Sequence, residues 1–277
     1  MTLALTGATR LFVIVGDPIA QVKAPGGLTR EFAALGHDGI VVPVHVAPAD
    51  LAAFLIVADR LRNLDGIIAT VPHKFACFQH CTSATAHSSF LRAANLLRRR
   101  ADGGWHGDML DGIGFVDAVR AQGFTLHGKR ALLAGAGGAG SAIALALIEA
   151  GVTELAIHDD DAARRDGLIG RLAGLGKGCV VVGSADPSGF DFIANATPAG
   201  MKAGDASPFD LDRLSPRMFV GCVITSPAVP PLIERARAIG CATSTGSDMY
   251  QAIQAPMLAF LLHADRERSR HEAVREP

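Results

Sequence analysis

A short apolar run, a glycine-rich turn and a second apolar segment follow one another in the middle of the chain. The stretch reads Ala131-Leu132-Leu133-Ala134-Gly135-Ala136-Gly137-Gly138-Ala139-Gly140-Ser141-Ala142-Ile143-Ala144-Leu145. Its first four residues predict a buried strand, and residues 141–150 predict a helix. A glycine-rich turn between a strand and a helix is typical of a dinucleotide-binding fold.

The glycines of this turn have separate expected tasks. Gly135 permits a tight turn, Gly137 lets the backbone approach a pyrophosphate, and Gly140 lets the helix and strand pack closely. The start of the helix offers N–H groups and the positive end of its dipole to phosphates. A strand-turn-helix that is merely rich in small residues is the alternative. We predict that the whole turn binds the cofactor, through Gly135, Ala136, Gly137, Gly138, Ala139 and Gly140.

Three consecutive carboxylates follow the next expected strand, 154–158. An acidic side chain about 20 residues past the glycine turn accepts hydrogen bonds from the ribose hydroxyls of a dinucleotide. A 2′-phosphate would be repelled by Asp159 and Asp160, and the nearest arginines, Arg164 and Arg165, lie on the following helix. We therefore predict NAD as the preferred cofactor and NADP as a possible one. An acidic turn that caps the helix from Ala162 is an alternative that can coexist.

Apolar runs alternate with longer mixed segments along the rest of the chain, which predicts an α/β fold of parallel sheets with helices on their faces. Further strands are expected at 11–15, 39–46, 65–70, 179–182, 192–195 and 219–224, and helices at 28–35, 47–62, 162–175, 230–239 and 249–262. Two such series indicate two domains with a junction around 112–128. The charged tail from Asp265 is expected to fray.

The composition argues against several classes of function. The chain has 277 residues and a formal net charge of −1, whereas a nucleic-acid-binding protein needs a basic surface. The local basic run Arg98-Arg99-Arg100 is interpreted as a solvated turn. The most apolar segment, 131–152, is rich in glycine and contains Glu149, so a membrane span is not expected.

The five cysteines are scattered and odd in number, which suits free thiols in a reducing cytoplasm better than a disulfide framework. Residues 1–10 lack the basic start and long apolar stretch of a signal peptide. We expect a cytoplasmic protein whose partner is a small molecule, with no nucleic acid and no membrane. The sequence leaves both a monomer and a homodimer open.

Several further motifs occur in a defined order. They are Gly16-Asp17-Pro18-Ile19-Ala20, Thr70-Val71-Pro72-His73-Lys74, Ala93-Ala94-Asn95, Gly107-Asp108-Met109-Leu110-Asp111-Gly112-Ile113-Gly114-Phe115, the glycine turn, and Asn195-Ala196-Thr197-Pro198-Ala199-Gly200-Met201. With these motifs the chain resembles the shikimate/quinate dehydrogenases, and within them the divergent shikimate dehydrogenase-like branch. The resemblance extends over residues 16–260.

The resemblance implies an N-terminal substrate domain, 1–113, on which residues 247–277 pack back, and a C-terminal Rossmann domain, 114–246. It implies NAD(P)-dependent hydride transfer on a shikimate- or quinate-like hydroxy acid, an activity of aromatic amino acid biosynthesis. It also implies that Lys74 and Asp111 form the catalytic pair and that Thr70 and Asn95 contact substrate hydroxyls. The other residues that it places at the cofactor are Asn195, Thr197, Met201, Val223, Gly246 and Met249.

This chemistry suits these residue types. When an alcohol is oxidised, a hydride leaves carbon and only a cofactor can take it, while the proton on oxygen needs a positioned acid–base group. Lys74 follows an expected buried strand, at the edge where ligands bind in open α/β sheets. Asp111 can pair with this lysine and bind a substrate hydroxyl. Taken alone, Lys74 would be interpreted as a solvated lysine at a helix start.

The chain departs from the family pattern where the substrate is recognised. Val22 and Ala24 occupy the positions of two serines that hold the substrate carboxylate in the family, and neither donates a side-chain hydrogen bond, although Lys23 or Gln21 could compensate. The other substrate positions are Thr225, where the family often has tyrosine, and Gln254, with Gln251 as the alternative; Met109 and Leu110 replace polar residues. We expect a more apolar pocket, for which shikimate and quinate are weak substrates and a related cyclic or smaller hydroxy compound is the better one.

Two rival hypotheses remain open. His73, Cys77, His80 and Cys81 are close in sequence and suggest a zinc site, but no paired Cys-x-x-Cys motif accompanies them and we predict no metal. The chain could also bind NAD as a sensor or partner module with vestigial catalysis. The loss of the two serines favours that alternative, and the presence of Lys74, Asp111 and Asn95 together opposes it.

Overall fold

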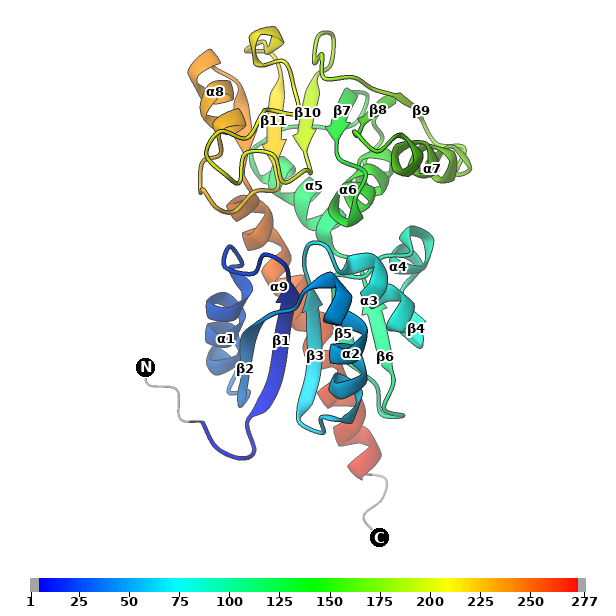
Figure 1. Cartoon of the computed structure of the whole chain (residues 1–277), viewed down its shortest axis with the longest axis vertical. Helices are drawn as coiled ribbons and strands as arrows, with labels where there is room; N and C mark the ends of the chain where they lie inside the picture. Colours follow the sequence, from blue (N-terminus) through cyan, green and yellow to red (C-terminus); the bar gives the residue numbers. More distant parts are fainter. Residues whose placement is uncertain (1–4, 274–277) are drawn as a thin grey trace. The chain divides into compact units, whose positions relative to one another are not determined.

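The computed structural model describes residues 5–273 and divides the chain into two compact units (Figure 1). Unit 1 comprises the chain up to Leu110 together with the chain from Gln254, and unit 2 comprises Asp111–Ile253. Each unit has one six-stranded sheet in the part of the chain described. The fold is therefore two α/β domains, as the sequence predicts.

The sheet of unit 1 is mixed, whereas the sequence led us to expect parallel strands. β1 pairs in parallel with β2 and β3, but β5 runs antiparallel to both β3 and β6. The strand order is β2-β1-β3-β5-β6-β4. The strands are β1 Arg10–Gly16, β2 Gly39–His45, β3 Leu64–Ala69, β4 Ser83–Ala84, β5 Leu96–Arg99 and β6 Trp105–Asp108. β5 and β6 are not expected from the sequence, because each has only four residues and carries charged or polar side chains.

Helices cover both faces of this sheet because the strands are apolar on both sides. Val13 and Val15 face a core that includes Leu51 and Leu55 of α2, and on the other face Phe12 packs against Phe32 of α1, with ring centroids 4.5 Å apart. The helices of unit 1 are α1 Ala24–Ala34, α2 Leu51–Arg60, α3 Lys74–His80 and α4 Ala86–Leu91, and a 3₁₀ turn, Pro48–Asp50, precedes α2.

The basic run at residues 98–100 is not a solvated turn. Arg99 is the last residue of β5, is only 7% exposed, and lies over the ring of Trp105 at 4.0 Å from its centroid. Its guanidinium donates to carbonyl oxygens around the end of α2, including Ala58 at 2.6 Å and Leu61 at 3.2 Å. A buried cation needs such partners, and several unpaired carbonyls at a helix C-terminus supply them. The interpretation as a solvated turn was therefore wrong.

Unit 2 has the strand order of a dinucleotide-binding domain. Its sheet runs β12-β11-β10-β7-β8-β9 with neighbouring strands parallel, which is the Rossmann order read from the opposite edge. The strands are β7 Arg130–Ala134, β8 Glu154–His158, β9 Cys179–Val182, β10 Phe192–Asn195, β11 Phe219–Cys222 and β12 Ala242–Ser244, and the helices are α5 Asp111–Ala121, α6 Gly138–Glu149, α7 Ala162–Ala173 and α8 Pro231–Ile239. The segment expected as a junction, 112–128, is thus mostly helix α5.

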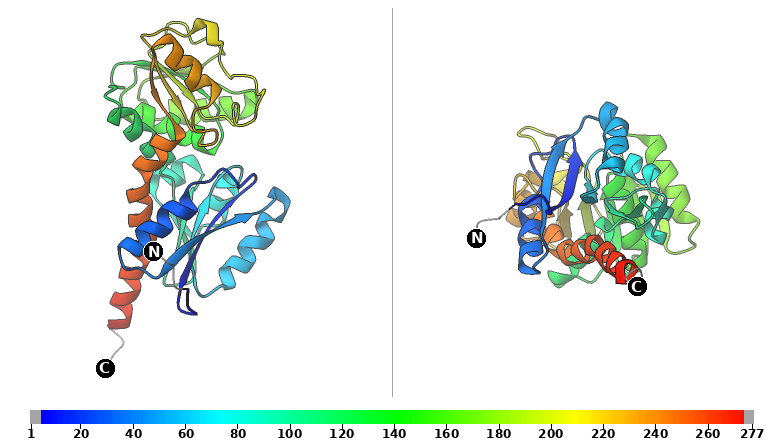
Figure 2. Two further views of the ribbon diagram at one scale, coloured as in Figure 1. Left: turned by 90° about the vertical axis from the view of Figure 1, so that its left-hand side faces the viewer. Right: turned by 90° about the horizontal axis from the view of Figure 1, so that it is seen from below.

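The last helix, α9, spans Gly246–Ala273 and returns to unit 1 (Figure 2). Phe260 stacks on His106 of β6, and Leu261 lies against Gly66 of β3. The helix continues well past Asp265, so the expectation of fraying was wrong for residues 265–273. Residues 257–273 contain neither glycine nor proline, so no helix-breaking residue interrupts the helix there. Residues 274–277 lie outside the described part.

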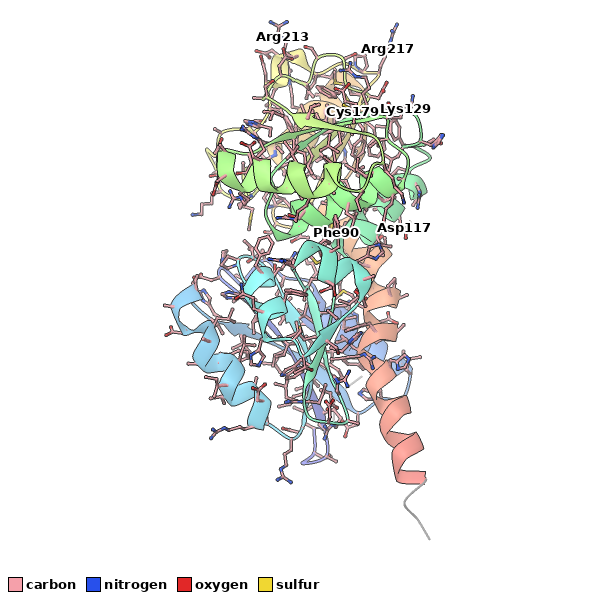
Figure 3. The ribbon with its side chains drawn as sticks, turned by 90° about the vertical axis from the view of Figure 1, so that its right-hand side faces the viewer. Phe90, Asp117, Lys129, Cys179, Arg213 and Arg217 are labelled. Carbon is pink, nitrogen blue, oxygen red and sulfur yellow. The ribbon has the colours of Figure 1, made fainter. Side chains whose placement is uncertain are left out.

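All five cysteines are free, and Cys179 at the start of β9 is the exposed one among them (Figure 3). Burial raises the pKa of the Cys77 and Cys81 thiols to about 12, so they are protonated and unreactive at neutral pH. Across the described residues, the structure has no helix both long and apolar enough to cross a membrane.

Candidate active site

The glycine turn of unit 2 lies at the carboxyl end of β7, beside β10, where the strand order of the sheet reverses. Gly135 has φ +101°, a conformation that side chains disfavour, and a Cβ on Gly140 would overlap the carbonyl oxygen of Gly135. A Cβ on Gly137 would meet nothing within 4 Å. The turn therefore needs glycine at two positions for its own packing and leaves open space at the third, which fits a bound pyrophosphate.

Helix α6 begins directly at this turn. Its N-cap is Gly137, which has no side chain to satisfy the first N–H groups, and its first turn contains no acidic residue. The free N–H groups and the helix dipole favour an anion at this position. The residues of unit 2 thus fit the phosphates of a dinucleotide.

Asp159 is held against the glycine turn rather than projecting from it. Its Oδ2 accepts from the backbone N–H of Ala136 at 2.6 Å, and its Oδ1 accepts from Asp161 N at 2.9 Å and from Arg164 Nη2 at 2.7 Å. Burial opposes the charged form, but the hydrogen bonds from Arg164, Ala136 and Asp161 outweigh it, so the pKa of Asp159 is lowered. Asp160, the next residue, is exposed.

Asn195 organises the turn that follows β10. Its side chain is buried; the amide oxygen accepts from the N–H and hydroxyl of Thr197 at 2.9 and 2.7 Å, and the NH₂ group donates to Ala199 O at 3.1 Å. A Cβ on Gly135 would contact the backbone of Ala196, so this turn abuts the glycine turn. Asn195 therefore shapes the turn that carries Thr197, while Met201 lies partly buried beyond it.

The other expected cofactor residues of unit 2 gather after β11. Val223 donates its N–H to Asn195 O at 3.0 Å, and Gly246 lies so close to Val223 O that it has no space for a Cβ. Thr245 and Asp248 cap the start of α9 through mutual hydrogen bonds, and Met249 is buried on its first turn. Thr225 also belongs to unit 2, whereas Gln254 belongs to unit 1.

In unit 1, backbone hydrogen bonds bring the strand-end loops to one edge of the sheet. Thr70 N donates to Val15 O at 2.9 Å, and Asp17 N donates to Val71 O at 2.9 Å. Ala94 N donates to Lys74 O, also at 2.9 Å. The loop after β1, the loop that carries Thr70 and Lys74, and the turn before β5 are thus joined to one another.

Asn95 links this edge to the segment that precedes Asp111. Its backbone N–H donates to Asp108 O at 3.0 Å, and its side-chain Oδ1 accepts from Leu110 N at 3.0 Å. Since the amide oxygen is oriented by Leu110, the other end of the side chain is an NH₂ donor. Asp111 follows Leu110 in the sequence as the first residue of α5 in unit 2, while Lys74 belongs to unit 1.

His73 is a residue of this edge that sequence analysis considered only as a metal ligand. Its side chain is 2% exposed, and its Nε2 lies 2.7 Å from Val46 O, so Nε2 carries a proton and donates it. The hydrogen bond fixes the residue next to Lys74 to the end of β2. The signal that could have indicated this role is its place between Pro72 and Lys74 at a strand end.

The other members of the suggested zinc cluster are engaged in hydrogen bonds that do not converge on one point. His80 Nε2 lies 2.9 Å from Asp59 Oδ1, and the thiol of Cys81 donates to Cys77 O at 3.3 Å. Within the described residues, no three histidine, cysteine or acidic side chains gather as a metal site.

The loop between β1 and α1 carries Val22, which is partly buried, and Ala24, which is buried at the start of α1. Lys23 is exposed, and Gln21 Nε2 donates to Pro18 O at 2.9 Å. Asp17 pairs with His45 at 2.8 Å. The donors expected to compensate for the two missing serines are thus turned to the loop itself or to solvent.

Comparisons with known proteins agree with this architecture. Residues 14–97 match the family described as "Shikimate dehydrogenase substrate binding domain". A shikimate dehydrogenase (NADP(+)) of Rubrobacter xylanophilus is 35% identical over 258 residues, which cover 91% of this chain and 90% of that protein.

Two solved structures show the same fold over nearly the whole chain. Quinate dehydrogenase from Corynebacterium glutamicum, in complex with NAD, has a TM-score of 0.80 and 26% identity and covers 96% of this chain and 99% of its own. Ligand-free 5-ketofructose reductase of Gluconobacter sp. strain CHM43 has a TM-score of 0.78 and 25% identity, with 92% and 93% covered. From the match over nine-tenths of its length, the chain belongs to the shikimate dehydrogenase family.

Proposed function

We propose that this chain is an NAD(P)-dependent dehydrogenase that interconverts a secondary alcohol and a ketone on a compound related to shikimate or quinate. One observation carries the proposal: the loops of unit 1 that hold Thr70, Lys74 and Asn95 are bonded together at one sheet edge. The same chain also carries a glycine turn typical of dinucleotide-binding domains. The structural relatives are named for quinate and 5-ketofructose, so the architecture serves more than one hydroxy compound.

In the proposed reaction the neutral amine of Lys74 takes the proton from the substrate hydroxyl during oxidation, and the resulting ammonium returns it during reduction. Asp111 balances the charge of the lysine and accepts a hydrogen bond from a substrate hydroxyl. The bound dinucleotide supplies the hydride acceptor, which no side chain can. Thr70 and the NH₂ group of Asn95 orient the substrate hydroxyls so that the reacting carbon is held in place.

We also propose that this chain prefers NAD, although its curated relatives are named for NADP(+). Arg164, the cation nearest to the acidic turn, is held by Asp159. Asp160 is exposed beside this pair. A 2′-phosphate would therefore meet unbalanced negative charge, whereas ribose hydroxyls would meet acceptors.

Steady-state rates with both cofactors against a panel of hydroxy acids, including shikimate and quinate, test these proposals. We expect Lys74→Met to lower kcat by about 10²- to 10⁴-fold with little change in the KM of the cofactor, while Lys177→Met, an exposed lysine of unit 2, serves as the control. Unchanged activity of Lys74→Met on every substrate would refute the enzyme assignment.

The cofactor preference has its own test. We expect Asp160→Arg to raise kcat/KM with NADP relative to NAD, and Asp166→Arg, an exposed acid on the following helix, to leave that ratio unchanged. Efficient NADP-linked oxidation of shikimate by the unaltered protein would contradict both the cofactor argument and the expectation of weak shikimate turnover.

A further inference from the structure

The loop between β1 and α1 contributes to the ligand edge of unit 1 but offers little to an anion. It is tied to the Thr70–Lys74 loop by the hydrogen bond from Asp17 N to Val71 O. In open α/β sheets ligands bind at this carboxyl edge of the strands. The chemistry of residues 17–25 therefore bears directly on which substrates fit.

Two donors of this loop are used within it, and two of its side chains offer none. The backbone N–H of Val22 donates to Ile19 O at 3.3 Å, and the side-chain amide of Gln21 donates to Pro18 O at 2.9 Å. The side chains of Val22 and Ala24 carry no polar atom. Pro25 lies in the first turn of α1 and has no N–H, so this helix start presents one donor fewer than usual.

The charges of the loop do not favour an anion either. Asp17 is a carboxylate paired with His45 at 2.8 Å. Lys23, the cation of the loop, is exposed, and an exposed lysine is a solvent-screened charge without fixed geometry. A carboxylate removed from water requires several charge-assisted hydrogen bonds, and the side chains of this loop do not supply them.

The rest of the edge suits uncharged hydroxyl and carbonyl groups. Thr70 carries a hydroxyl, and Asn95 presents an NH₂ donor because Leu110 N holds its oxygen. Met109 is buried and apolar at the end of β6. Groups of this kind pair with neutral oxygens without the desolvation cost of a full charge.

We propose that the substrate of this chain is an uncharged polyhydroxy ketone, or the corresponding alcohol, with no carboxylate anchored at the β1–α1 loop. The inference rests on the proposed function, and the hydride transfer between substrate and cofactor is the same as in that proposal. It narrows the proposed substrate class to uncharged compounds, because the carboxylate of shikimate would find no anchoring side chain at the β1–α1 loop.

Shikimate and its methyl ester form a matched pair, since both have the same ring hydroxyls and only the acid is charged. We measure kcat/KM for both, and for reduction of 5-keto-D-fructose, and we measure binding of the same three probes by calorimetry with the cofactor present. We expect the ester to be bound and oxidised at least as well as the acid. We expect Val22→Ser with Ala24→Ser to raise the acid-to-ester ratio of kcat/KM by about tenfold or more, the factor that one hydrogen bond to a charged group provides. Ala34→Ser, which adds a hydroxyl at the exposed far end of α1, is the control and should leave the ratio unchanged.

Two outcomes would overturn the inference. The first is a preference of the unaltered protein for the acid over the ester by about tenfold or more. If Lys23→Met then lost that preference, Lys23 would be the residue that anchors a carboxylate. The second is the failure of both uncharged probes to bind. Binding of the ester at least as tightly as the acid, with no turnover of any probe, would refute the proposed reaction and support the inference about charge.

Discussion

Replacing each of two glycines of the same turn with alanine should damage a different property of the protein. A Cβ on Gly140 would overlap the carbonyl oxygen of Gly135, whereas a Cβ on Gly137 would meet nothing within 4 Å. Gly137 also has φ −71°, which alanine adopts without strain. The structure therefore predicts that Gly140→Ala damages the fold itself and that Gly137→Ala damages only the binding of the cofactor.

The magnitudes follow from these contacts. For Gly140→Ala, overpacking against backbone costs about 1–3 kcal/mol of unfolding free energy, and the helix propensity of alanine returns at most about 1 kcal/mol. For Gly137→Ala, the unfolding free energy should stay within about 0.5 kcal/mol of the parent. Its added methyl group would occupy the space assigned to the pyrophosphate, so the Kd of NAD should rise about tenfold or more, the factor for 1.4 kcal/mol.

Denaturant unfolding measures the first quantity, and calorimetric titration with NAD and NADP measures the second. Gly170→Ala is the matched control, because Gly170 lies in α7 with open space around it, and this substitution should stabilise the protein by about 0.5–1 kcal/mol. If Gly137→Ala bound both cofactors as tightly as the parent, the phosphates could not lie at this turn. A Gly140→Ala variant as stable as the parent would show that the turn adapts to a side chain.

Three further predictions concern residues held by hydrogen bonds. Asp159→Asn should lower the unfolding free energy at pH 7 by about 1 kcal/mol, given that Arg164 is partly exposed. Because the pKa of Asp159 is lowered in the folded state, its contribution to stability is complete above the unfolded pKa of about 4 and is lost as pH falls through the folded pKa. A difference in stability between variant and parent that does not shrink in acid would contradict this role. His73→Leu should lower kcat by about tenfold or more with little effect on the KM of the cofactor, since it releases the loop that carries Lys74. His73→Gln keeps a hydrogen-bond donor and should recover part of the loss. Equal rates for the two variants would argue against the hydrogen bond to Val46. Arg99→Met should lower the unfolding free energy by about 3 kcal/mol because it leaves buried carbonyls without a donor. Denaturant unfolding measures this loss, with Arg60→Met at an exposed arginine as the control. A loss as small as that of the control would exclude this stabilising role.

The glycine turn shows how much of this protein can be predicted from local sequence. Strand, turn and helix each depend on residues adjacent in the chain: the apolar run 131–134, the glycines that permit the turn, and the small apolar residues of α6. Strong local signals of this kind place the Rossmann domain and most of its strands. Gly240, with φ +98° at the end of α8, is a second case in which one residue type fixes the end of a helix.

Residues whose roles depend on distant partners were interpreted less well. Arg99 looked like part of a solvated basic turn because neighbouring residues do not reveal that carbonyls 35 to 41 residues away in sequence would accept from it. The antiparallel strand β5 was missed for the same reason, since its pairing with β3 and β6 gives four polar-rich residues a place in the sheet. The sequence offered His73 only as a member of a zinc cluster that we did not predict, and its hydrogen bond to Val46 O came from the structure alone.

The sequence by itself determined the two α/β series, the dinucleotide turn and the identity of the residues proposed for catalysis, because these depend on local pattern and on motif order. Only the tertiary structure decided what those residues touch. It showed that Asp159 supports the glycine turn, that Asn195 shapes the turn that carries Thr197, and that the strand-end loops of unit 1 are bonded into one edge. The physical reason is that hydrogen bonds and packing join segments far apart in the chain, and a linear pattern carries no record of which segments will meet.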